Sequence, residues 1–110
     1  MATAGGAEAV IVALADPTRR AVLDLLVDHG DGTATTLAGE LPVSRPAVIK
    51  HLGVLDRAGL VEARRRGREV RYSVRPEPLV ETAEWMEGIA ARWNARLTAL
   101  KRLAESDHPA

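Results

Sequence analysis

Residues 44–55, SRPAVIKHLGVL, predict a helix with a well-defined start, and this helix constrains the fold more than any other stretch of the chain. Ser44 is a favoured N-cap residue, because its hydroxyl can accept a hydrogen bond from an amide of the first turn. Pro46 falls within that turn, where a missing N–H costs little. Three aliphatic residues follow at a spacing of three or four and predict one buried face: Val48, Leu52 and Leu55.

The preceding segment indicates that this helix is the second helix of a helix-turn-helix. Residues 35–41, TTLAGEL, predict a short helix that is capped by Thr35 or Thr36. Only a proline and a valine separate it from Ser44. Two short helices joined by so tight a turn form a helix-turn-helix, whose second helix enters the major groove of DNA. The exposed side of that helix has a basic N-terminal half formed by Arg45, Ile49 and Lys50.

After this helix the hydrophobic period changes from that of a helix to that of a strand. Gly59 is placed to end the helix in a left-handed conformation. Residues 69–74, EVRYSV, alternate polar with apolar residues, which predicts a strand with one apolar face. Residues 60–65 can pair with this strand through a turn around Gly67. We therefore predict a mostly α fold with a small β-hairpin wing, which is a winged helix-turn-helix.

Two runs of sequence resemble a known family. SRPAVIKHLGVLDRAGLVE at residues 44–62, together with ADPTRRAVLDLL at residues 15–26, is similar to the ArsR-type (ArsR/SmtB) winged-helix repressors of bacteria. The resemblance covers residues 14–74, and the C-terminal helix less specifically. It implies a homodimeric, DNA-binding transcriptional regulator that usually represses its own operon.

The second helix of the helix-turn-helix, residues 44–55, is the predicted reader helix. Its contacts are divided between bases and phosphates. Arg45 lies in the first turn, where side chains meet base edges, and its fork matches the O6 and N7 atoms of guanine. Related repressors often carry a small polar residue where this chain has Ile49, which favours contact with a thymine methyl group instead. Phosphates would be held by Thr35, Thr36, Ser44, Lys50 and His51, and the wing would reach the backbone or the minor groove. The complete predicted DNA-binding set is Thr35, Thr36, Ser44, Arg45, Pro46, Ile49, Lys50, His51, Arg64, Arg65, Arg66 and Arg68.

The distribution of charge supports a nucleic-acid partner. Residues 45–75 contain nine Lys and Arg against three Asp and Glu, a net of +6, whereas the formal charge of the whole chain is zero. The remainder therefore carries a net of −6. One strongly basic segment on an acidic body is typical of a protein that binds double-stranded DNA. The alternative is an ordinary solvated face.

Residues 76–105 predict one long C-terminal helix that pairs with a second copy of the chain. Its apolar residues keep a four-three spacing over more than three heptads. A helix of about 26 residues is about 39 Å long, whereas a compact chain of this length is about 26 Å across. The helix would therefore overhang its own domain, with folding back as a core helix the alternative. We predict a homodimer interface formed by Val10, Ile11, Leu14, Leu79, Ala83, Met86, Ile89, Ala90, Trp93, Leu97 and Leu100.

Capping and composition predict the other boundaries. Residues 1–7 are small or flexible and are predicted to be disordered. Residues 8–15 predict a short helix that opens the DNA-binding domain, which spans residues 8–75. An Asp-Pro pair at Asp16 then starts the next helix. Residues 106–110 form a tail.

Several functional classes are disfavoured by what the sequence lacks. There is no cysteine, and the three histidines are scattered, so we predict no metal site and no cofactor. The family's metal-independent branch therefore fits best. Carboxylates are not paired in an apolar pocket and no nucleophile has an adjacent base, so the chain is predicted not to be an enzyme. The start lacks a basic segment and its apolar run is too short for a signal peptide or a membrane span, so we predict a cytoplasmic protein without membrane contact.

Two other functions stay open at this point. A winged helix can serve protein–protein contact, although such a domain would have little reason to carry five arginines on one hairpin. A regulator of this type can also respond to a small ligand, whose identity the sequence does not give.

Overall fold

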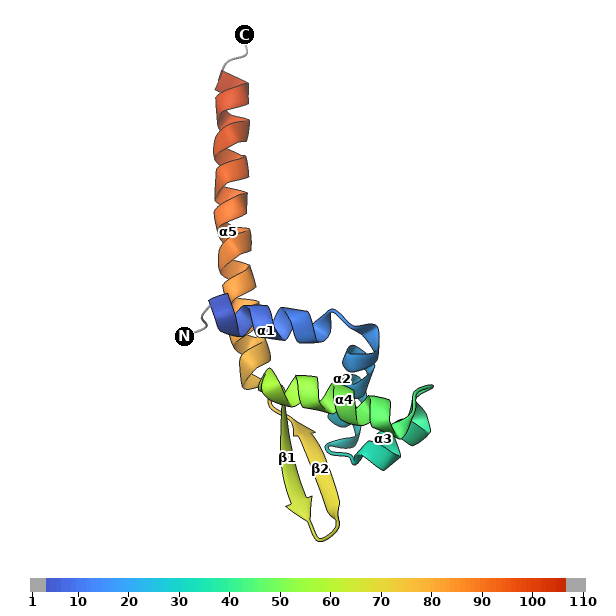
Figure 1. Ribbon diagram of the computed structural model, residues 1–110. Coiled ribbons are helices and arrows are strands. Elements are labelled where there is room, and N and C mark those ends of the chain that lie inside the picture. Colours follow the sequence, from blue (N-terminus) through green and yellow to red (C-terminus); the bar gives the residue numbers. More distant parts are fainter. Residues whose placement is uncertain (1–3, 107–110) are drawn as a thin grey trace.

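The computed structural model describes residues 4–106 as five helices and one antiparallel hairpin (Figure 1). Helices α1 to α4 and the hairpin form one body, and α5 projects from it as a long rod (Figure 1). This architecture confirms the predicted winged helix-turn-helix. The elements in chain order are α1 (Ala4–Leu14), α2 (Pro17–His29), α3 (Ala34–Glu40), α4 (Arg45–Arg57), β1 (Val61–Arg66), β2 (Glu69–Val74) and α5 (Glu77–Ser106).

Helix α1 begins at Ala4, so the predicted disorder of residues 1–7 is wrong for residues 4–7. The reason is packing, because Ala7 is buried on the same face as two later residues of the helix, Val10 and Ala13. Residues 1–3 and the predicted tail beyond residue 106 lie outside the described residues.

Two arginines of α2 close the C-terminal end of α1. Nε of Arg19 donates to the carbonyl oxygen of Ala13 at 2.6 Å, and Nη1 of Arg20 donates to the carbonyl oxygen of Leu14 at 2.6 Å. The last turn of a helix leaves such acceptors without an intrahelical partner. A positive charge at this end also suits the helix dipole. Both arginines therefore stabilise the junction between α1 and α2.

Helix α2 starts at the predicted Asp-Pro pair. The carboxylate of Asp16 accepts hydrogen bonds from the amides of Thr18 at 2.7 Å and of Arg19 at 3.2 Å. Desolvation raises the pKa of this carboxyl, but the two bonds and the charges of Arg19 and His51 outweigh it, so the pKa of Asp16 lies below its ordinary value. Gly30 ends the helix with φ of 84°, a conformation that favours glycine.

The N-cap of α3 is Thr33, rather than the predicted Thr35 or Thr36. The hydroxyl of Thr33 accepts from the amide of Thr36 at 3.1 Å, and the hydroxyl of Thr36 accepts from the amide of Thr33 at 3.0 Å. These reciprocal bonds form a capping box. A threonine stands where glutamate or glutamine usually marks this motif, which explains the wrong prediction.

Helix α4 has the cap, the buried face and the end that the sequence predicts. The hydroxyl of Ser44 accepts from the amide of Ala47 at 3.3 Å. At the other end, Gly59 has φ of 76°, and the amide of Leu60 donates to the carbonyl oxygen of Leu55 at 2.9 Å, as in a Schellman motif. The face toward the core is fully buried and consists of Val48, Leu52 and Leu55.

The hairpin is tighter than its sequence indicated. Arg66 pairs with Glu69, so only Gly67 and Arg68 form the turn. Gly67 has φ of 60°, and none of the described residues other than glycine has a positive φ. This combination is typical of a type II′ turn, whose twist matches that of the two strands.

A third segment adds to the hairpin. Gly32, in the connection between α2 and α3, exchanges two backbone hydrogen bonds with Tyr72 of β2, at 3.0 and 2.8 Å. The wing is therefore joined to the helix-turn-helix by backbone bonds as well as by the chain itself.

The core lies between α1, α2, α3 and α4 and the base of the hairpin. Its fully buried large side chains are aliphatic: Val10, Val22, Leu26, Leu37, Val48, Leu52, Leu55, Leu60 and Val61. This core holds α3 and α4 in a fixed relation to the wing.

Helix α5 overhangs the body as predicted. The molecule measures 75 × 30 × 21 Å, and the distal part of α5 contacts nothing else in the protomer (Figure 1). The alternative, in which α5 folds back as a core helix, is wrong. Trp93 and Leu97 are each 56% exposed, and Met86, Leu100 and Leu103 are similarly exposed. Within residues 4–106, no helix is long and apolar enough to cross a membrane.

Of the residues predicted for the dimer interface, Val10 belongs to the protomer's own core, and Leu14 and Leu79 are partly buried against it. Val10 is 1% exposed, and Leu14 and Leu79 pack against the core cluster. The reason is that one face of α1 packs on the body, while Leu79 lies in the first turns of α5, beside that body. Ile11 is exposed as predicted, and its neighbour Val12, which the prediction omitted, is also exposed.

Candidate DNA-binding surface

The N-terminal half of α4 presents a partly basic edge to solvent. Arg45 and Lys50 are exposed, and Ile49 is 42% exposed although the adjacent Val48 is buried. Within residues 4–106, Lys50 has no carboxylate partner. A helix with an apolar back and a free cation on its leading edge has the shape and charge to enter a DNA major groove.

Arg45 is oriented by a residue of α3. Its Nε donates to the hydroxyl oxygen of Thr35 at 3.1 Å. The bond crosses the turn of the helix-turn-helix and connects the first turn of α3 to the first turn of α4. Both side chains are exposed, so the guanidinium lies at the surface and not in the core.

A surface groove connects α3, α4 and the wing. It is lined by Thr33, Ala34, Thr35, Thr36, Arg45, Ile49, Arg68, Glu69, Val70 and Tyr72. Five of the residues predicted to contact DNA line this groove, from three different elements: Thr35, Thr36, Arg45, Ile49 and Arg68. The fold thus brings the start of the reader helix and the wing turn to one surface.

The arginines of the hairpin lie on two faces. Arg65 is paired in register with Val70, and these two share the face that carries Tyr72. Arg64 is paired with Arg71, so it lies on the opposite face. The prediction treated the hairpin arginines as one group, because a count of charges does not separate the two faces of a strand.

The arginines also differ in their partners. Nε of Arg64 lies 3.4 Å from a carboxylate oxygen of Glu62, and Arg71 is paired with two carboxylates. Three other arginines near the tip are exposed, and within residues 4–106 they have no carboxylate partner: Arg65, Arg66 and Arg68. Unpaired cations can approach phosphates without first breaking an ion pair.

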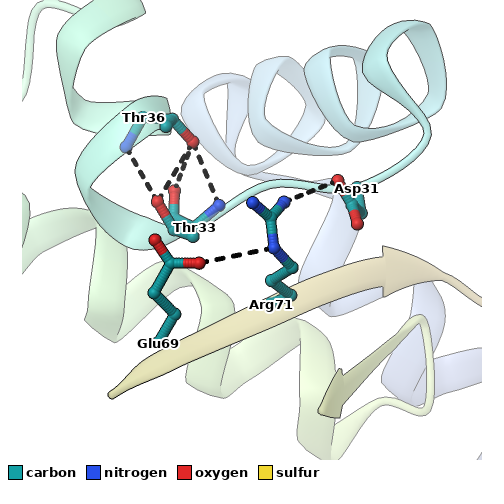
Figure 2. Close-up of polar contacts among 5 residues, drawn as sticks. All are labelled: Asp31, Thr33, Thr36, Glu69 and Arg71. Atoms are coloured by element: carbon teal, nitrogen blue, oxygen red, sulfur yellow. Dashed lines mark hydrogen bonds and ion pairs between the residues drawn. The ribbon is translucent and has the colours of Figure 1, made fainter. Parts of the chain in front are cut away.

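Arg71 joins the wing to the connection between α2 and α3 (Figure 2). Its Nη1 lies 2.9 Å from the carboxylate of Asp31, and its Nε lies 3.5 Å from that of Glu69. An exposed pair of this kind contributes only about 0.2–1 kcal/mol, so the backbone bonds between Gly32 and Tyr72 are the stronger link. Sequence reasoning missed this network, because the two residues of the Asp31–Arg71 pair lie 40 positions apart.

Comparison with known proteins agrees with this geometry. A helix-turn-helix domain family matches residues 14–64. The transcriptional repressor SdpR of Bacillus subtilis is 38% identical over 77 residues, which are 70% of this chain and 84% of that protein. The solved structure of an ArsR-like transcriptional regulator from Rhodococcus sp. RHA1 is 43% identical with a TM-score of 0.82, covering 91% of this chain and 93% of that one. The chain belongs to the ArsR family of winged-helix regulators.

Membership of the ArsR family makes the protein a DNA-binding transcriptional regulator, and its named relatives are regulators rather than enzymes. A further solved structure, from a protein of Mycobacterium bovis that is titled a possible ArsR-family transcriptional regulator, is described as a homodimeric winged helix-turn-helix DNA-binding domain. It is 26% identical with a TM-score of 0.62, and the match covers 96% of this chain and 83% of that one.

Two residues of this ArsR-family regulator do not fit their predicted phosphate contacts. The hydroxyl proton of Thr36 is donated to the carbonyl oxygen of Thr33 at 3.0 Å (Figure 2), and a hydroxyl has only one proton to donate. His51 is half-buried, and its Nδ1 is buried without a hydrogen-bond partner. The ring is therefore less available to a phosphate than the exposed side chains at the start of α4.

Ser44 and Pro46 lie where the sequence places them, at the exposed start of α4. The hydroxyl of Ser44 accepts the amide of Ala47, and its own proton is free to be donated to a phosphate.

Residues 4–106 contain no cluster of three or more histidine, cysteine or acidic side chains that could hold a metal ion. His29 and Glu40 form an exposed pair, in which Nε2 of His29 lies 3.1 Å from a carboxylate oxygen of Glu40. His108 lies outside the described residues.

Proposed function

We propose that this ArsR-family protein represses transcription as a homodimer on a pseudo-palindromic operator, without a metal sensor site. The observation that carries the proposal is the groove that joins Arg45 and Ile49 of α4 to Arg68 of the wing. A groove built from the start of a reader helix and a basic wing turn is suited to a DNA duplex, which offers base edges and phosphates side by side. That the relative SdpR is named a repressor supports the direction of regulation.

The contacts we assign follow from the exposure and pairing of each side chain. Arg45 reads a guanine, and Ile49 touches a thymine methyl group. The phosphate backbone is held by the side chains that are exposed and free to donate to it: Ser44, Lys50, Arg65, Arg66 and Arg68. Arg64 and Arg71 are held by carboxylates and contribute less.

The proposal of a homodimer rests on the apolar stripe of α5. Trp93, Leu97 and Leu100 are more than half exposed on a helix that stands clear of the body. Exposed apolar patches of this kind mark interaction surfaces in soluble proteins. The heptad spacing repeats along one helix face, so a second copy of the same helix is a complementary partner. The homodimeric relative from Mycobacterium bovis supports this assignment.

The charges beside the stripe favour an antiparallel pair of α5 helices. Flanking positions carry Glu87 in the half near the body, and Arg96 and Lys101 in the distal half. In a parallel pair the heptad pattern sets Arg96 opposite the partner subunit's Lys101, and the two cations repel each other. An antiparallel pair can place Glu87 beside the partner subunit's Lys101 on both sides of the twofold axis. The same register sets the two copies of Arg96 opposite each other, so two attractive pairs outnumber one repulsive pair. It also brings the distal end of one helix toward the exposed Ile11 of the other protomer.

The proposal of a metal-independent repressor rests on ligand chemistry. Sensors of soft metals require thiolates, and borderline metals require clustered histidine and carboxylate ligands. The chain has no cysteine. Its exposed His29–Glu40 pair supplies only two ligands.

One titration tests both the DNA-binding and the metal-independent part of this proposal. Protein is added to a labelled duplex that carries its own promoter, with zinc, cadmium, arsenite or no addition. We expect tight binding that is the same in all four series, because residues 4–106 hold no cluster of ligands that would couple a metal to α4. Metal-dependent release would contradict the metal-independent mechanism, and a lack of duplex binding would support a winged helix that serves protein–protein contact.

A further inference from the structure

The bond between Thr35 and Arg45 uses one edge of the guanidinium and leaves the other free. Arginine carries five N–H donors, and only Nε–H is engaged with the hydroxyl oxygen of Thr35, at 3.1 Å. The two terminal nitrogens, Nη1 and Nη2, form the end of the fork. Such a fork matches two acceptors side by side, as guanine presents at O6 and N7.

We propose that Thr35 is a positioning residue, which fixes the guanidinium of Arg45 so that its Nη1 and Nη2 end faces a guanine. The inference rests on the proposed function, in which Arg45 reads a base. It differs from the phosphate contact that the sequence predicted for Thr35, a contact that the free hydroxyl proton of Thr35 would still permit and that the test below separates from the positioning role. The role is specific to position 35, because the hydroxyl of Thr36 is used within the capping box of α3.

The acidic residue nearest to this arrangement already has a partner of its own. The acidic residue that lines the same groove is Glu69, and its carboxylate is held by Arg71 at 3.5 Å. Arg71 in turn is fixed by Asp31 at 2.9 Å (Figure 2). Arg45 is therefore held by a neutral acceptor instead of a carboxylate, so its charge stays available to the DNA.

The bond to Thr35 increases the affinity for the operator, because it orders the side chain of Arg45 before DNA binds. A free arginine loses much rotamer freedom when it docks on a base, and a bond already present in the free protein reduces that loss. The gain applies only where the oriented fork meets its two acceptors. Thr35 therefore acts on sequence preference, whereas a phosphate contact acts on every duplex alike.

The test compares Thr35→Val with the matched control Thr35→Ser. Valine keeps the shape of threonine but cannot accept from Nε, while serine keeps the hydroxyl. Each variant is titrated against the operator, against operators altered at single positions, and against a scrambled duplex. We expect Thr35→Val to lower operator affinity about threefold to tenfold, to relax preference at the base pair that Arg45→Ala relaxes, and to leave scrambled DNA unchanged. Thr35→Ser should behave as the wild type.

A double-mutant cycle with Arg45→Ala completes the test. If Thr35 acts through Arg45, adding Thr35→Val to Arg45→Ala has no further effect. An equal loss on operator and scrambled DNA, or an additive loss in the double variant, would overturn the proposal and restore the phosphate contact. These results are distinguishable from a failure of the proposed function, in which the wild type itself shows no sequence preference. A thermal unfolding midpoint equal to that of the wild type confirms that Thr35→Val is folded.

Discussion

Replacing Trp93 and Leu97 together with glutamate is expected to convert the protein into monomers and to lower its operator affinity by about 10²–10⁴-fold. The physical reason is that two reader helices on one dimer bind two half-sites with a high effective concentration, which a monomer loses. Both side chains are 56% exposed in the protomer, so the substitutions leave the core of the body intact. Sedimentation velocity at micromolar concentration measures the first effect, and duplex titration measures the second.

The matched control is Val27→Glu on α2. Val27 is 64% exposed but lies away from the α5 stripe, so this variant should remain a dimer and bind DNA normally. Circular dichroism confirms that each variant is folded. A wild-type protein that sediments as a monomer at micromolar concentration would contradict the dimer directly.

The same assay determines the orientation of the pair. In the antiparallel arrangement, Lys101→Glu sets two carboxylates beside each other and weakens the dimer, and adding Glu87→Lys restores it. The expected change is about threefold to tenfold, since each exposed pair contributes about 0.2–1 kcal/mol and the symmetry makes two of them. A parallel pair predicts the reverse, because Lys101→Glu would then relieve the repulsion from Arg96 of the partner subunit.

The second large effect is expected at the reader helix. Arg45→Ala should cost about 1–3 kcal/mol of binding free energy on the operator and relax preference at one base pair in each half-site. Affinity for a scrambled duplex should fall much less, because the bidentate contact to guanine exists only at the correct sequence. Competition titrations with single-position variants of the operator measure this directly.

Arg68→Ala should contrast with Arg45→Ala, because Arg68 lies in the wing turn and is proposed to contact the DNA phosphate backbone. It should weaken operator and scrambled DNA nearly alike, and reduce the salt slope by about one unit. Arg64→Ala is the comparison on the same hairpin, and it should weaken both duplexes less than Arg68→Ala, because Glu62 competes with phosphate for that guanidinium. If Arg68→Ala changed sequence preference while Arg45→Ala lowered affinity on every duplex, the roles of reader and backbone contact would be reversed.

The parts of the fold that depend on local chemistry were predictable from sequence. Ser44, Asp16 and Gly59 act through neighbours within a few residues, and the structure has each of them where capping rules predict. The overhang of α5 was also predictable, because its length exceeds the diameter of the body. The spacing of apolar residues identified the buried face of α4, because this spacing is a property of one helix alone.

One local feature, the N-cap of α3, was missed because Thr36 completes the capping box in place of a glutamate or glutamine. The other parts that failed depend on tertiary contacts. Val10 was predicted at the dimer interface, but the packing of α1 on the body buries it in the protomer. Gly32 pairs with Tyr72, and Asp31 pairs with Arg71, across some 40 residues of chain. Arg64 and Arg65 lie on opposite faces because successive strand residues alternate. The strand register, which the turn at Gly67 fixes, decides that Arg65 shares the face of Val70 while Arg64 lies beside Arg71.

A nuclease footprint on the protein's own promoter tests the central claim most directly. The claim is that two copies of α4 read two half-sites in successive major grooves. The expected result is a pair of protected segments with related, inverted sequences, whose centres lie about 10–10.5 base pairs apart or a multiple of that distance. Arg45→Ala should abolish protection at concentrations where the wild type protects fully. Protection of a single segment, or uniform protection without sequence preference, would contradict the account.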